Sequence, residues 1–149
     1  MGTMLTHEEL RVRLMPVFAQ FSAIKAVYLF GSAVTGRMHS ESDLDLAVVS
    51  EPSLASSKLE ILTELARRGF DNVDLVFLDR AGIVLRHEAV RQNCLVYVTP
   101  DFNRGGYYSR VTREYLDFLP YLRVQREAYR WRMTHGTPGS NPQAADTTG

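Results

Sequence analysis

Apolar residues near the start of the chain recur at helical spacing. The residues that carry this period are Leu10, Leu14, Val17, Phe18 and Phe21. They predict an amphipathic helix over residues 6–20. Thr6 followed by Glu9 is a capping-box pattern, which places the start of the helix at Thr6. Pro16 lies inside the pattern and is expected to kink or divide the helix, since proline donates no backbone hydrogen bond.

Three apolar runs of strand length follow, and a helical pattern separates the second run from the third. Residues 24–30 are almost continuously apolar, which indicates a strand that is buried on both faces. Residues 43–49 form the second expected strand and residues 73–78 the third. Between these two, a helix is expected over residues 54–68, and Gly69 stops it.

The rest of the chain is expected to add two helices and one short strand. Asp79 is expected to cap a helix over residues 81–92, and residues 95–98 form a fourth strand. The period is helical again over residues 102–133, where Pro120 is expected to break or bend the helix. The sequence therefore predicts an α/β (α+β) architecture: a mixed sheet of about four strands, flanked by helices, with a C-terminal helical extension.

The domain organisation follows from length and composition. A chain of 149 residues is large enough to bury a real core as one domain. We expect this domain to span residues 1–133, with residues 102–133 as its C-terminal helical segment. Residues 134–149 are small, polar and rich in proline and glycine, so they are expected to be disordered.

Basic residues outnumber acids in the last expected helix. The arginines are Arg104, Arg110, Arg113, Arg123, Arg126, Arg130 and Arg132, against Glu114, Asp117 and Glu127. One interpretation is a terminal helix that packs on the sheet and keeps a solvated basic face. In the other, Tyr121, Tyr129 and Trp131 form a docking surface for a partner. RNA is less favoured as that partner, because no stacking platform accompanies the arginines.

Charge and composition exclude several classes of function. The formal net charge is zero, so direct nucleic-acid binding is not expected. No apolar run approaches the ~20 residues that are needed to cross a bilayer, and the first residues lack the apolar core of a signal peptide. Cys94 is the single cysteine, which excludes an internal disulfide and fits the cytoplasm.

The strongest chemical signal lies in the turn between the first two expected strands. Gly31 permits a sharp backbone turn, and Ser32 can begin a short helix whose free N–H groups and hydroxyl would hold phosphate oxygens. On the second strand, Asp43 and Asp45 point to the same side because side chains alternate faces. Two neighbouring carboxylates repel each other, and a divalent cation such as magnesium removes that penalty.

Three further residues are candidates for the same site. Asp74 interrupts the apolar third strand, where a carboxylate is costly unless it binds a metal or lies at an edge. Arg37 could contact a triphosphate or could be a solvated surface residue. Ser42, directly before the first acid, either contacts phosphate or only shapes the turn.

The Gly31-Ser32 pair, followed after ten residues by Asp43-Leu44-Asp45, resembles the signature of the DNA polymerase β-like nucleotidyltransferases. The short chain is most similar to their minimal branch, the MntA-type antitoxins that pair with HEPN (HepT-type) toxins. The resemblance implies that Asp74 is the third catalytic acid and that the three acids hold two magnesium ions. It also implies ATP as the donor, with transfer of AMP to a tyrosine of a HEPN ribonuclease toxin, which is thereby neutralised.

Other functions remain open from the residues alone. The chain could be an antitoxin that acts by binding, with its site unused. It could also transfer a nucleotide to a small molecule such as an aminoglycoside, although little chain remains for a second, substrate-binding domain. A glycosyltransferase Asp-x-Asp motif is the weakest alternative, since Gly31 and Ser32 would then have no role.

Overall fold

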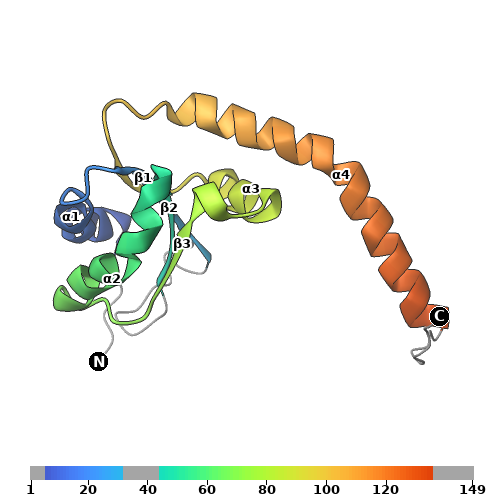
Figure 1. Cartoon of the computed structure of the whole chain (residues 1–149), viewed down its shortest axis with the longest axis horizontal. Coiled ribbons are helices and arrows are strands. Elements are labelled where there is room, and N and C mark those ends of the chain that lie inside the picture. The colour runs from blue at the N-terminus through green and yellow to red at the C-terminus, as the bar shows by residue number, and fades with distance from the viewer. Residues whose placement is uncertain (1–5, 32–43, 136–149) are drawn as a thin grey trace. The chain divides into compact units, whose positions relative to one another are not determined.

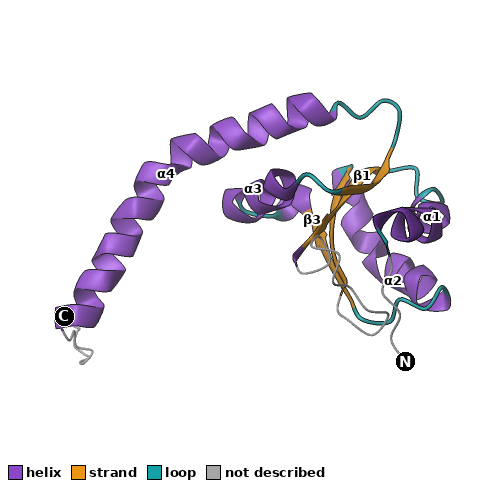
Figure 2. Ribbon diagram, turned by 180° about the vertical axis from the view of Figure 1, so that it is seen from behind, coloured by secondary structure: helices purple, strands orange, loops and turns teal. Residues whose placement is uncertain are grey.

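The computed structural model describes residues 6–31 and 44–135 (Figures 1 and 2). Ser32, Arg37, Ser42 and Asp43 lie outside the described residues, as do residues 136–149 of the expected tail. The candidate residues that can be placed are therefore Gly31, Asp45 and Asp74, and the fold is described here as the framework that positions them.

A four-stranded mixed sheet forms the centre of the fold. Its strands are β1 (Ile24–Phe30), β2 (Leu44–Ser50), β3 (Val73–Phe77) and β4 (Leu95–Val98). Their order across the sheet is β3-β2-β1-β4; β1 is antiparallel to both of its neighbours, and β2 is parallel to β3. The expected mixed sheet of about four strands is confirmed.

Two helices cover one face of this sheet, as Figure 1 shows. They are α1 (His7–Phe18) and α2 (Lys58–Arg67). Their apolar stripes pack on alternate strand residues to form the larger core cluster, whose central members include Leu14, Phe18, Ile61, Leu29, Leu46 and Leu75. These residues are almost completely buried, so most of the hydrophobic stabilisation of the fold comes from this layer.

The opposite face of the sheet carries a smaller core cluster. It is covered by α3 (Ile83–Gln92) and by the first turns of α4 (Arg104–His135). Tyr28 and Ala47 supply the strand side of this cluster, and Val111 of α4 is buried in it. Because alternate residues of β2 point to the two faces, Asp45 shares this second face with Ala47, while Leu44 enters the larger core.

The start of α1 is fixed by the predicted capping box. The Thr6 hydroxyl accepts a hydrogen bond from the Glu9 backbone N–H at 3.0 Å, and the Thr6 N–H donates to the Glu9 carboxylate at 2.9 Å. Pro16 does not divide the helix, which is assigned without interruption from His7 to Phe18. The proline removes only one donor, while Leu14, Val17 and Phe18 of the same stretch are anchored in the core.

The starts of two helices differ from those expected. Residues 52–57 form a 3-10 helix (Pro52–Ser57), so α2 begins only at Lys58. Asp79 is not a helix cap; it lies inside a short 3-10 helix (Leu78–Arg80), and Gly82 is the N-cap of α3. The physical reason is that each connection leaves its strand through a tighter 3-10 turn before the α-helix begins.

The last helix has the expected length, but it begins and ends two residues later than expected. α4 continues through Pro120 and reaches His135, so residues 134 and 135 are helical and do not belong to a disordered tail. The chain divides into two compact units, Met1–Thr112 and Arg113–Gly149. Within the second unit, the rings of Trp131 and His135 stack with centroids 4.2 Å apart.

Candidate active site

Asp45 and Asp74 are direct partners across two neighbouring strands. The parallel pairing of β2 with β3 aligns Leu44 with Val73, Asp45 with Asp74, and Leu46 with Leu75. Aligned residues of adjacent strands project to the same face of a sheet, so the two carboxylates lie side by side on the face opposite the larger core. The sequence predicted that these acids converge, and the strand register brings them together.

Gly31 lies directly beside the Asp45 carboxylate, at the end of β1. It follows the last residue of β1, where Phe30 is paired with Asp45, and its φ of +81° lies in the left-handed region that favours glycine. A Cβ atom at residue 31 would collide with the Oδ2 atom of Asp45. The sequence predicted a turn glycine here, but the close approach to Asp45 depends on the register of β1 with β2 and could not be predicted.

The two acids differ in exposure because their strands occupy different positions in the sheet. Asp45 is half-buried on β2, which has a strand on each side, whereas Asp74 is exposed on β3, the edge strand. An acid at the edge of a sheet keeps its hydration, so burial alone does not require a metal at Asp74. The observation that assigns Asp74 to the candidate site is its pairing with Asp45 across β2 and β3.

The donor atoms of the site suit a hard cation. Paired carboxylates with solvent on one side are the kind of ligand set that magnesium binds, and it keeps room for phosphate oxygens. Within residues 6–31 and 44–135 there is no group of three or more His, Cys, Asp or Glu side chains that could hold a metal. The expected third carboxylate, Asp43, lies outside these ranges, so Asp45 and Asp74 are the two members of the set that the structure places.

Tyr28 lies on the same face of the sheet and serves a structural purpose. It is buried, and its ring stacks on Tyr107 at 6.3 Å. Burial, together with the nearby Tyr107, raises the pKa of Tyr28 to about 12, although Arg104 acts in the opposite direction. The Tyr28 hydroxyl therefore stays protonated at neutral pH and cannot serve as a base there.

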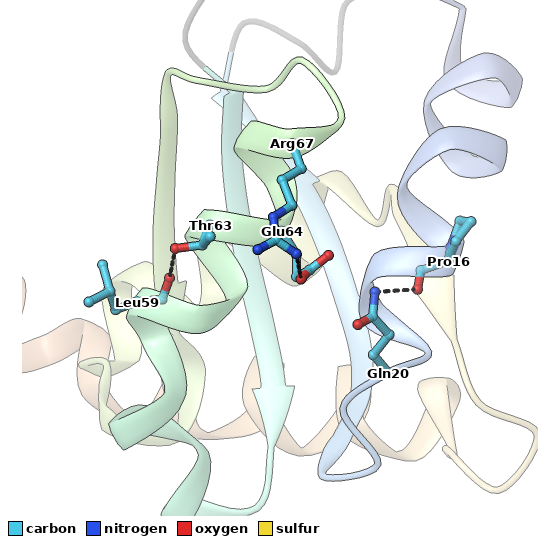
Figure 3. Close-up of polar contacts among 6 residues, drawn as sticks. All are labelled: Pro16, Gln20, Leu59, Thr63, Glu64 and Arg67. Atoms are coloured by element: carbon cyan, nitrogen blue, oxygen red, sulfur yellow. Dashed lines mark hydrogen bonds and ion pairs between the residues drawn. The ribbon is translucent and has the colours of Figure 1, made fainter.

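A groove on the other face of the sheet is separate from the acids. It has a volume of about 400 Å³ and lies between the end of α1 and α2. Its residues are Gln20, Phe21, Leu59, Glu60, Thr63, Glu64 and Arg67. Figure 3 shows local partners for several of its polar groups: Arg67 pairs with Glu64 at 2.9 Å, and Gln20 donates to the carbonyl of Pro16 at 3.2 Å. This groove has no catalytic set of residues.

Two curated proteins match the chain, and both are described as "Protein adenylyltransferase MntA". The protein from Shewanella oneidensis is 37% identical over 70 residues, which are 46% of this chain and only half of that protein's length. The protein from Aphanizomenon flos-aquae is 26% identical over 117 residues, which are 71% of this chain and 78% of that protein.

Solved structures show the same fold. A crystal structure of a toxin-antitoxin with AMP-PNP matches with a TM-score of 0.65 and 25% identity, covering 83% of this chain and 98% of that chain. A structure of the tri-AMPylated Shewanella oneidensis HEPN toxin in complex with MNT antitoxin matches with a TM-score of 0.63 and 21% identity, covering 87% and 99%.

No helix among the described residues is both long and apolar enough to span a bilayer.

The family assignment rests on the segment that contains the site. The family model "Polymerase beta, Nucleotidyltransferase" matches residues 13–101, which include the Gly31 turn and both placed acids. This chain belongs to the polymerase beta nucleotidyltransferase family.

Proposed function

We propose that this chain is a magnesium-dependent protein adenylyltransferase, acting in the cytoplasm as the antitoxin of a HEPN-family toxin. It transfers AMP from ATP to a tyrosine of the toxin and so blocks its ribonuclease site. The observation that carries the proposal is the alignment of Asp45 with Asp74 beside Gly31, in a chain of the nucleotidyltransferase family. The names of the two MntA relatives and the toxin-antitoxin complex with AMP-PNP support the donor and the partner.

The residues of the site fit magnesium and a nucleotide. Asp43 and Asp45 would hold magnesium against the phosphates, and Asp74 would complete the set from the neighbouring strand. Bound there, magnesium supplies neutralisation of the negative charge on the triphosphate. Gly31 leaves the space beside Asp45 free of a side chain, and Ser32 and Arg37 would bind the outer phosphates, with Ser42 beside the first acid.

The reaction needs no covalent intermediate with the enzyme. The tyrosine hydroxyl oxygen of the acceptor attacks the α-phosphorus, and the bond between that phosphorus and the oxygen of the β-phosphate breaks, so that pyrophosphate leaves. Asp74 is the exposed carboxylate on the acceptor side and takes the proton that the hydroxyl loses. The rate then depends mainly on the positioning of the two reactants and on compensation of charge.

A protein acceptor fits this site better than a small one. The edge position of Asp74 gives lateral access to the site, and neither Asp45 nor Asp74 lines the grooves that lie elsewhere on the first unit. A protein supplies its own shape for recognition, whereas an aminoglycoside would need a binding pocket beside the acids. The small-molecule alternative is therefore the weaker one.

The test uses the chain together with its genomic neighbour's product. The two proteins are incubated with ATP and magnesium, and the intact mass of the partner is measured. We expect the mass to increase by one or more AMP units, and no increase with the Asp43→Asn, Asp45→Asn double variant. If that variant still neutralises the toxin as fully as the wild type does, neutralisation is by binding alone and the proposed mechanism is wrong.

A further inference from the structure

A second polar groove lies between the end of α3 and the start of α4. Its volume is about 390 Å³, which is within the range of small-molecule sites. The residues that line it are Arg91, Asn93, Arg104, Gly105, Tyr108 and Ser109. All six belong to the first compact unit, so the groove is part of the same body as the acids.

The connection of α3 to β4 places this groove at the catalytic end of the sheet. The carbonyl of Cys94, next to Asn93, accepts a hydrogen bond from the Leu29 N–H at 2.7 Å. On the other side of β1, Phe30 is paired with Asp45. Asn93 and Asp45 therefore flank the last residues of β1 from opposite sides. Because neighbouring strands lie about 4.8 Å apart, the backbones at Asn93 and Asp45 are separated by roughly 10 Å across the sheet.

The side chains that line the groove suit a nucleotide. Arg91 and Arg104 supply positive charge for a phosphate group, and Tyr108, which is 41% exposed, offers an aromatic face on which a base can stack. Ser109 and Asn93 add a hydroxyl and an amide. No carboxylate lines this groove, whereas Glu64 lines two grooves of similar size elsewhere on the described residues.

The two arginines are not equivalent. Arg91 is already bonded to Glu88 at 2.7 Å, and that bond holds the pKa of the Glu88 carboxyl below its ordinary value. Arg104 donates at 2.9 Å to the side-chain oxygen of Asn93, which is neutral. No carboxylate in the lining of the groove balances the charge of Arg104, and the bond to Asn93 holds its guanidinium in one position, so Arg104 is the main anion-binding group of the groove.

We infer that this groove binds the phosphodiester of a short adenylate that is already attached to the acceptor, and so positions the acceptor for a further transfer at Asp45 and Asp74. The inference rests on the proposed function and names a second binding site for its product. Binding in the groove requires only a local cluster of positive charge, so the inference is compatible with the zero net charge of the whole chain.

Binding can be measured without catalysis. The full chain is titrated into dye-labelled, 5′-phosphorylated triadenylate, and the fluorescence anisotropy is recorded with a chelator present, so that metal-dependent binding at the acids does not contribute. We expect Arg104→Gln to weaken binding about tenfold and Tyr108→Ala to weaken it by a similar factor. Arg123→Gln, on the same helix but outside the groove, should bind as the wild type does.

A second variant protects the test against a folding defect. Arg104 also fixes the loop at Asn93, so Arg104→Gln could disturb the local structure. Ser109→Glu leaves that bond intact and puts a negative charge into the groove, and it should also weaken binding at least tenfold. Wild-type affinity in Ser109→Glu, no binding by the wild type, or equal displacement of the triadenylate by inorganic phosphate would each overturn the inference.

The count of AMP units on the acceptor separates this inference from the proposed function. With the acceptor present, the wild type should add several AMP units, and Arg104→Gln and Ser109→Glu should stop after the first. If both variants add as many units as the wild type does, the groove has no such role although the proposed function stands. If the wild type binds triadenylate in the groove but transfers no AMP to any acceptor, the proposed function is wrong, and the acceptor role of the groove is overturned with it.

Discussion

Gly31 and Asp45 are packed so closely that a side chain at residue 31 and the carboxylate of Asp45 exclude each other. The contact joins the end of β1 to the start of β2 at the residue pair where Phe30 and Asp45 face each other. The absence of a side chain at Gly31 therefore allows Asp45 to occupy its position. For this reason a substitution of Gly31 tests the site directly, whereas a substitution of a turn residue that does not contact an acid would not.

Gly31→Ala is expected to lower AMP transfer by about a hundredfold or more. The new methyl group would push the Asp45 carboxylate out of its place, and displacements of about 1 Å can cost a hundredfold in rate. The positive φ adds about 1–2 kcal/mol of strain to the folded state. Transfer is measured by the intact mass of the acceptor, and stability by thermal unfolding.

Gly82→Ala is the matched control for this prediction. Gly82 is the N-cap of α3, and a Cβ there would meet nothing within 4 Å. Its transfer rate should stay close to that of the wild type. Equal rates for both alanine variants would show that the approach of Gly31 to Asp45 has no catalytic importance.

Asp74→Asn should reduce transfer by about 10²–10⁴-fold while the protein stays folded, because the amide cannot take the proton of the acceptor. ATP and magnesium should still bind, which can be measured by calorimetry. Asp79→Asn is the control: Asp79 is an exposed acid in the 3-10 helix that follows the other end of β3. If the two substitutions have the same small effect, Asp74 is a surface acid.

The stability of the fold should fall in alkaline solution because of Tyr28. Burial raises the pKa of Tyr28 to about 12 from an ordinary value near 10, so the folded state holds this proton more tightly than the unfolded state does. The resulting stabilisation is complete below pH 10 and is lost as the pH rises towards 12. Urea unfolding between pH 9 and 12 measures the loss, and Tyr28→Phe should make the decline shallower. The same slope in both proteins would contradict this assignment.

Thr6→Ala should destabilise the fold by about 1 kcal/mol, since it removes the hydroxyl that accepts from the Glu9 N–H at the start of α1. Ser57→Ala is the matched control, because Ser57 is the N-cap of α2 but makes no capping hydrogen bond with its side chain. The free energies of unfolding of the two variants can be compared in urea. A loss at Ser57 as large as that at Thr6 would show that capping is not the cause.

Partner binding can be followed at Trp131, the single tryptophan of the chain. Its side chain is 59% exposed on the arginine-rich part of α4. If Tyr121, Tyr129 and Trp131 form the docking surface, the emission of Trp131 should shift to shorter wavelength as the proposed toxin partner is added, because the ring leaves water. Complex formation with unchanged emission would mean that this part of α4 is a solvated helix.

Periodicity was a good guide to the elements that bury apolar residues. The bounds of β1 and β4 agree with the expected strands 24–30 and 95–98, because both are apolar runs packed between layers. The faces of Leu44, Leu46 and Asp45 followed from alternation alone. These predictions depend on the hydrophobicity of each side chain, which can be read directly from the sequence.

The errors concern effects that a single residue does not determine. Pro16 was expected to kink or divide its helix and Pro120 to break or bend its helix, yet neither helix is divided, because each proline removes only one donor. Asp79 was expected to cap a helix, whereas the chain leaves β3 through a 3-10 turn and Gly82 takes that position. The groove of Arg104 and Tyr108 was missed because its two sides come from separate helices, and only the fold brings them together.

The place of β3 in the sheet has a consequence for self-association of the protein. Among the strands that the structure describes, β3 pairs only with β2, and an unpaired edge strand can pair with a strand from another molecule. Asp74 puts a negative charge on that margin. The same carboxylate that is proposed to receive a proton from the acceptor would therefore also discourage self-association through β3, and a neutral residue there would be expected to increase aggregation as well as to slow the reaction.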